Sequence, residues 1–125
     1  MARSSDIRKR KPSGGTIKVA RKKQHAHLAS RPTMTKISER STTVSRSLGS
    51  AVKQRILTEN KVNVFDPKKK KAVIATIKVV VENPANRNFI RRNILTKGTV
   101  VDTDLGKVRI TSRPGQVGSL SGVLV

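Results

Sequence analysis

The feature that most constrains the fold is an apolar residue at every second position between 72 and 82. Val73, Ala75, Ile77, Val79 and Val81 recur at every second position. A period of two is that of a β-strand with one face against a core, because successive side chains point to opposite sides of the strand. The pattern predicts one long strand at 72–82 that forms the spine of the core.

Most of the remaining apolar residues lie in short runs separated by turn signals. Turns are expected at 48–50, at Asp66-Pro67 before four consecutive lysines, and at 104–106. Residues 113–116 read Arg-Pro-Gly-Gln, which predicts a type II turn. This spacing predicts a mainly β fold, a small antiparallel β-barrel of about six short strands or a sandwich. The other strands are expected at 42–46, 52–56, 62–65, 94–95, 99–101 and 107–111, and the apolar residues Val117, Leu120 and Val123 to Val125 close the chain.

One short helix is expected directly after the long strand. Asn83 is a suitable N-cap and Pro84 suits the first helical position. The prediction is roughly two helical turns that end near Asn93. Arg87 and Arg91 would then share one face, which suits contacts with phosphate and sugar. The alternative is a connector whose arginines are simply solvated.

The charge of the chain indicates its partner. With 28 Lys and Arg against 7 Asp and Glu among 125 residues, the formal net charge is +21. Charge of this size destabilises a compact state by self-repulsion, and a polyanion is the simplest compensation. Nucleic acid is the first candidate. A membrane is a poor one, because no apolar run approaches the ~20 residues of a spanning helix and no Trp or Tyr is present.

The cations and the apolar residues are distributed differently. Residues 1–40 contain twelve Lys and Arg and few apolar residues, whereas residues 41–125 contain nearly all of the Val, Ile and Leu. We therefore predict an extended basic arm at 1–40, ordered by RNA, and a β-barrel body at 41–125. In the arm, Pro12, Gly14 and Gly15 follow a cation cluster and would let the backbone turn tightly close to RNA. The cluster Arg21-Lys22-Lys23 could equally belong to a flexible basic tail.

Residue types exclude several other functions. The chain has no cysteine, which fits a cytosolic protein and removes thiol catalysis. His25 and His27 lack a third ligand nearby, so neither a metal nor another cofactor is expected. Asp102 and Asp104 are the only close carboxylate pair, and Asp104 is explained by the turn that follows it. We predict that the protein is not an enzyme and takes no small-molecule substrate.

Two classes of polyanion-binding function remain open. One is a structural RNA-binding protein that neutralises phosphates between RNA segments. The other is an accessory factor, such as an RNA chaperone or a nucleoid protein, that binds RNA or DNA reversibly. With only two aromatic residues, Phe65 and Phe89, recognition by phosphate, sugar and groove shape is expected rather than base stacking.

Several segments of the chain form one recognisable pattern, above all Val-Glu-Asn-Pro-Ala-Asn-Arg at 81–87. The other segments of this pattern are Lys-Pro-Ser-Gly-Gly at 11–15, Ala-Arg-Lys-Lys at 20–23, Arg-Pro at 31–32, Thr-Lys-Ile at 35–37, Arg-Arg-Asn-Ile at 91–94, Thr-Lys-Gly at 96–98 and Thr-Ser-Arg-Pro-Gly-Gln at 111–116. Together they resemble one family, the small-subunit ribosomal proteins of the S8e family, which archaea and eukaryotes share. The length is similar to that of the archaeal form.

The resemblance implies a β-barrel with a basic extension in the cytoplasmic ribosome. Its implied partners are small-subunit ribosomal RNA and neighbouring ribosomal proteins, and its implied role is subunit assembly and stabilisation. The RNA contacts that it implies are Lys9, Arg10, Lys11, Arg21, Lys22, Lys23, Arg87, Arg91, Arg92, Lys97 and Arg113. Charge and turn chemistry add Arg8, Gly14, Gly15, Arg31, Lys68, Lys69 and Lys70 as candidate RNA-binding residues.

Overall fold

The computed structural model describes residues 10–17 and 30–125. The chain divides into two compact units, Met1–Pro32 and Thr33–Val125. The first strand of the second unit, at Thr35–Lys36, therefore lies within residues 1–40, the segment that the sequence predicts to be an extended arm. None of the helices in the described part of the chain is long and apolar enough to cross a membrane.

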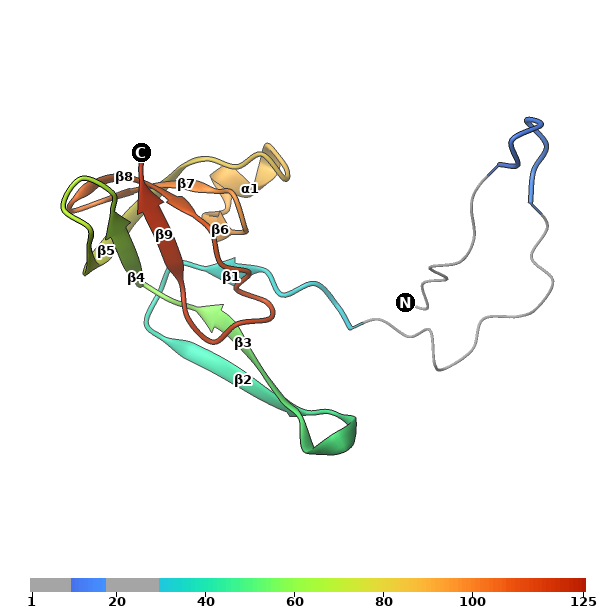
Figure 1. Ribbon diagram of the computed structural model, residues 1–125, viewed down its shortest axis with the longest axis horizontal. Helices are drawn as coiled ribbons and strands as arrows, with labels where there is room; N and C mark the ends of the chain where they lie inside the picture. The colour runs from blue at the N-terminus through green and yellow to red at the C-terminus, as the bar shows by residue number, and fades with distance from the viewer. Residues whose placement is uncertain (1–9, 18–29) are drawn as a thin grey trace. The chain divides into compact units, whose positions relative to one another are not determined.

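A closed five-stranded barrel forms the centre of the second unit (Figure 1). Its strands are β4 (Lys61–Asp66), β5 (Lys71–Glu82), β7 (Val100–Thr103), β8 (Gly106–Ile110) and β9 (Ser121–Leu124). They follow one another around the barrel in that order, each antiparallel to the next. Only the pair that closes the barrel, β4 with β9, is parallel. Closure leaves fewer exposed strand edges, and the predicted mainly β barrel is confirmed.

A second sheet of four strands lies beside the barrel in the order β2-β3-β1-β6. It consists of β1 (Thr35–Lys36), β2 (Ser41–Arg46), β3 (Val52–Thr58) and β6 (Ile94–Leu95). The turn predicted at 48–50 is present as a short 3-10 helix, η2 (Leu48–Ser50), between β2 and β3. Strand β1 is parallel to β3 and antiparallel to β6, so this sheet joins segments far apart in sequence.

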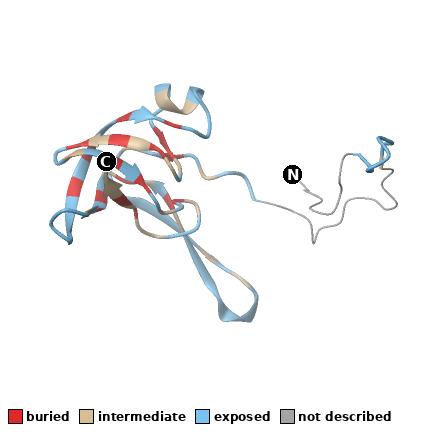
Figure 2. Cartoon of the chain, turned by 45° about the horizontal axis from the view of Figure 1, so that its top comes forward, coloured by how far each residue is buried: buried red, intermediate tan, exposed pale blue. Residues whose placement is uncertain are grey.

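One apolar core serves both sheets. Ile56 of β3 and Leu95 of β6 belong to the same buried cluster as the barrel residues, and each is at most 1% exposed. In Figure 2 the buried residues follow the barrel strands and the adjoining part of the second sheet. The remaining members of the cluster are Val62, Val64, Ala75, Ile77, Val80, Val101, Val108, Ile110 and Leu120.

Strand β5 departs from the predicted alternation. Ala75 and Ile77 are buried as expected, but the next buried residue is Val80, and Val79 and Val81 are 44% and 43% exposed. The register between β5 and β7 shifts between Ile77 and Val79. A bulge adds one residue to one strand and so moves the following side chains to the other face. The prediction of one uninterrupted inward face through Val81 was therefore wrong.

Val73, at the start of the same predicted face, is 48% exposed. It lies near one end of the barrel, where it lines a cavity of about 260 Å³ together with Leu105 and Leu124. Its burial is incomplete because the barrel ends there, although its position in the alternation is the inward one.

Of the turns predicted at 104–106 and 113–116, the first forms as predicted and the second forms with a different geometry. At Asp104–Leu105 a two-residue turn connects β7 to β8, with Gly106 at φ +122°, as predicted. At 113–116 a turn is present, because the Gln116 N–H donates to the Arg113 carbonyl at 2.9 Å. It is not type II, since Gly115 does not have positive φ. Thr33 lies near this turn: its Cβ would be 3.4 Å from a Cβ added at Gly115, which is an ordinary van der Waals distance.

Candidate nucleic-acid interface

The segment between β5 and β6 is organised by the buried side chain of Asn83, which is 5% exposed. Its amide nitrogen donates to the Ile94 carbonyl at 3.0 Å, and its oxygen accepts from the Ala85 N–H at 3.0 Å. The same oxygen accepts from the Thr96 hydroxyl, also at 3.0 Å. These bonds hold the two ends of the segment together.

This arrangement replaces the helix predicted from Asn83 to Asn93. The only α-helix here is α1 (Asn88–Arg91), and its N-cap is Arg87, without a side-chain capping bond. Asn83 and Asn86 each accept an N–H two residues ahead, as in turns that compete with helix formation. The prediction of two helical turns starting at Asn83 was wrong for this reason.

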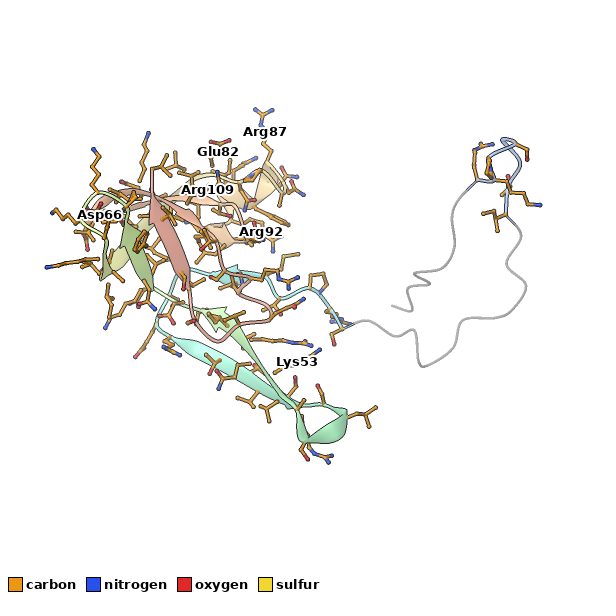
Figure 3. All side chains as sticks on the ribbon, viewed as in Figure 1. Lys53, Asp66, Glu82, Arg87, Arg92 and Arg109 are labelled. Atoms are coloured by element: carbon orange, nitrogen blue, oxygen red, sulfur yellow. The ribbon has the colours of Figure 1, made fainter. Side chains whose placement is uncertain are left out.

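The predicted arginine face nevertheless forms. Arg87 is in helical conformation at the N-cap, so it lies one turn before Arg91 and both are exposed. Arg92 is exposed at the C-cap. Ile90 is partly buried and packs against the core, which anchors the helix. In Figure 3 the side chain of Arg87 projects away from the barrel.

Lys97 belongs to the same corner of the molecule. An added Cβ on its neighbour Gly98 would lie 3.4 Å from Cγ of Pro84, so the 97–98 turn lies against the start of the segment. Gly98 has φ +87°, and its N–H donates to the Ile110 carbonyl at 2.8 Å. We name Arg87, Arg91, Arg92 and Lys97 the arginine cluster.

Carboxylates do not neutralise this cluster in the described part of the chain. The two ion pairs found there are elsewhere, Arg40 with Glu59 at 3.5 Å and Lys78 with Asp104 at 3.3 Å. The arginine cluster therefore presents guanidinium and ammonium groups that can bind phosphate oxygens.

The predicted lysine loop forms a second, separate basic surface. It is the turn between β4 and β5, where Asp66 Oδ1 accepts the Lys68 N–H at 2.9 Å and the Lys69 N–H at 3.4 Å. The lysines are exposed, and Lys70 has φ +51°. The turn and the arginine cluster adjoin opposite ends of β5, whose length is up to about 36 Å at ~3.3 Å per residue. The structure does not bring them together.

The tight turn predicted after Lys9-Arg10-Lys11 is confirmed. The Gly14 N–H donates to the Lys11 carbonyl at 3.0 Å, the Lys11 N–H donates to Gly15 at 2.8 Å, and Gly14 has φ +84°. The Arg10 guanidinium donates to the Gly14 carbonyl at 3.0 Å, which steadies the turn.

Other predicted residues lie elsewhere. Arg31 is exposed in the first unit. Arg113 is exposed next to Pro114, whose carbonyl accepts the Ile56 N–H at 2.9 Å, so it lies beside β3. The remaining candidates, Arg8, Lys9, Arg21, Lys22 and Lys23, lie outside the described residues.

Comparison with known proteins agrees with the sequence resemblance. Residues 4–125 match the family model of ribosomal protein S8e. The chain belongs to the ribosomal protein S8e family. A relative from Nanoarchaeum equitans, named small ribosomal subunit protein eS8, is 50% identical over 106 residues, covering 85% of this chain and 84% of the relative. Two further relatives of that name, from Methanocella arvoryzae and Methanobrevibacter smithii, are 45% and 41% identical over 93% and 100% of both chains.

Membership of the S8e family confirms the predicted family and the prediction that the protein is not an enzyme. In this S8e protein, the structure also shows basic residues that were not among the predicted contacts. Arg46, Lys53 and Arg55 lie on β2 and β3. The signal that could have found them is the absence of any Asp or Glu between residues 41 and 58.

Proposed function

We propose that this protein is a structural component of the small ribosomal subunit in the cytoplasm, where it binds ribosomal RNA and supports subunit assembly and translation. The observation that carries the proposal is the arginine cluster, held by a buried asparagine in a chain that matches the S8e family almost end to end. The names of the relatives, small ribosomal subunit protein eS8, support the same assignment.

The binding mechanism is neutralisation of phosphates by preorganised cations. Arginine can donate two parallel hydrogen bonds to one phosphate, and less entropy is lost when the backbone is already fixed. The Asn83 bonds to Ile94 and Thr96 fix that backbone before RNA binds. A mainly β body with two aromatic residues favours recognition of backbone and groove shape over base stacking.

The arm of residues 1–40 adds a second mode of binding. It carries twelve of the 28 cations, and its part before Thr33 orders on RNA, while the second unit, which begins at Thr33, binds as a preformed surface. Because the arginine cluster and the lysine turn adjoin opposite ends of β5, the body contacts more than one RNA segment. Its other partners are neighbouring ribosomal proteins.

The test is the salt dependence of binding to small-subunit ribosomal RNA. About six phosphate contacts give a slope of log affinity against log salt near −5. A slope near zero would contradict the electrostatic mechanism. In parallel, the protein should stay with the small subunit through a high-salt sedimentation gradient. An accessory RNA chaperone or nucleoid protein would dissociate from the subunit in high salt. Its crosslinks would be distributed over many RNAs or DNA and would not be concentrated on small-subunit RNA.

A further inference from the structure

The hairpin of β2 and β3, which we name the β2–β3 ribbon, extends beyond the barrel (Figure 1). Its strands pair with each other from Thr42–Ile56 to Arg46–Val52, whereas β1 reaches β3 only at Thr58. The ribbon is almost entirely exposed in Figure 2. An isolated two-stranded hairpin is marginally stable in water, so its outer half lacks the packing that would fix it.

The two faces of the ribbon differ in chemistry. Cross-strand partners share a face, so Thr43 with Arg55 and Ser45 with Lys53 form one polar and basic face. Lys53 lies on the part of the ribbon that projects from the barrel (Figure 3). The opposite face carries Val44, which is 58% exposed, with its partner Gln54, and also the pair Arg46 and Val52.

The tip of the ribbon is apolar. Leu48 is 98% exposed, and Val52 beside it is 60% exposed. Gly49 and Ser50 both have positive φ, which turns the backbone sharply and holds Leu48 at the end of the ribbon. A large apolar side chain in this position is unfavourable in water unless a partner covers it.

The charge of the ribbon selects the kind of partner. Residues 41–58 contain Arg46, Lys53 and Arg55, six Ser or Thr among the first ten positions, and no acid. Cations and hydroxyls together match phosphates and ribose 2′-hydroxyls. Both aromatic residues lie elsewhere, at positions 65 and 89, so the ribbon cannot stack unpaired bases on rings.

We propose that the β2–β3 ribbon is a finger that enters the minor groove of double-helical RNA tip first. The shallow RNA minor groove exposes ribose and base edges, which Leu48 contacts, while Lys53 and Arg55 bind the phosphates along the groove. This inference rests on the proposed function, because the helix belongs to small-subunit ribosomal RNA. It adds an RNA-binding surface separate from the arginine cluster and the lysine turn.

A directed-cleavage experiment tests the location. Since the chain has no cysteine, Ala51→Cys provides one attachment point for an iron chelate beside the tip, and Leu105→Cys provides one at the β7–β8 turn. Bound to small-subunit RNA, the Ala51→Cys protein should cleave both strands of one double-helical segment. The Leu105→Cys protein should leave that segment intact. Cleavage confined to single strands, no cleavage from bound Ala51→Cys, or crosslinks from position 51 only to another ribosomal protein would overturn the proposal.

A matched pair of variants tests the energetics. Lys53→Gln with Arg55→Gln removes two ribbon cations, and Lys107→Gln with Arg109→Gln removes two cations with the same spacing from β8. The ribbon variant should bind about tenfold more weakly, with a salt slope shallower by about two. The β8 variant should lose less RNA affinity than the ribbon variant. Equal losses would overturn the ribbon proposal while leaving RNA binding intact, whereas failure of the unaltered protein to bind the RNA would overturn the proposed function itself.

Discussion

The hydroxyl of Thr96 donates a 3.0 Å hydrogen bond to the side-chain oxygen of Asn83, 13 residues earlier in the chain. The bond closes the segment that carries the arginine cluster. It therefore couples a buried polar network to an exposed basic surface, and each can be perturbed separately.

Replacing Asn83 by Ala should lower the free energy of unfolding by about 2–3 kcal/mol, because the Ile94 carbonyl and the Ala85 N–H lose their partner in a buried site. RNA affinity should fall as well, since the arginines lose their fixed backbone. Urea unfolding and a binding titration measure the two effects. Asn86→Ala is the control: it loses one exposed bond, to the Asn88 N–H, and should cost under about 1 kcal/mol. Equal losses in both variants would contradict a special role for Asn83.

Replacing Arg87, Arg91 and Arg92 together by Ala should weaken RNA binding strongly while changing stability by less than about 1 kcal/mol, because all three side chains are exposed. The salt slope should become shallower by about three. Thermal unfolding of the triple variant at a much lower temperature would mean that these arginines are structural instead.

Gly122→Ala should destabilise the barrel by about 1–3 kcal/mol through overpacking. An added Cβ would lie 2.5 Å from Val108 Cγ1 and 3.0 Å from the Arg109 carbonyl oxygen. Gly115→Ala is the matched change, because the nearest atom there is 3.4 Å away and the cost should be smaller. Chemical denaturation of both variants gives the comparison, and equal stabilities would argue against the close β8–β9 contact.

Lys70→Gly should stabilise the protein by about 0.5–1 kcal/mol, because Lys70 has φ +51° and glycine adopts this conformation without steric cost. Lys68→Gly removes the same charge from the same turn at a residue without positive φ, so it should bring no gain. Comparing the melting temperatures of the two variants distinguishes relief of backbone strain at position 70 from reduced charge repulsion among the lysines. Equal gains would assign the effect to charge.

Much of the barrel could be predicted from local chemistry. The strand predicted at 107–111 is present as β8, in which Val108 and Ile110 are buried, and the turns at Leu48–Ser50 and Asp104–Gly106 follow from residues that tolerate tight backbone. The polyanionic character of the expected partner also followed from the net charge of +21 alone. These properties depend on residues near one another in sequence, so local patterns carry them.

Tertiary structure decided what depends on distant partners. Asn83 has the residue type of a helix cap, but its partners Ile94 and Thr96 become available only when β6 packs behind it. The bulge after Ile77 follows from pairing with β7. The sequence alone determined a mainly β, strongly basic protein with arginines next to Asn83. Only the fold decided which of its cations lie together, because pairing between strands far apart in the chain separates the arginine cluster, the lysine turn and the β2–β3 ribbon into distinct surfaces.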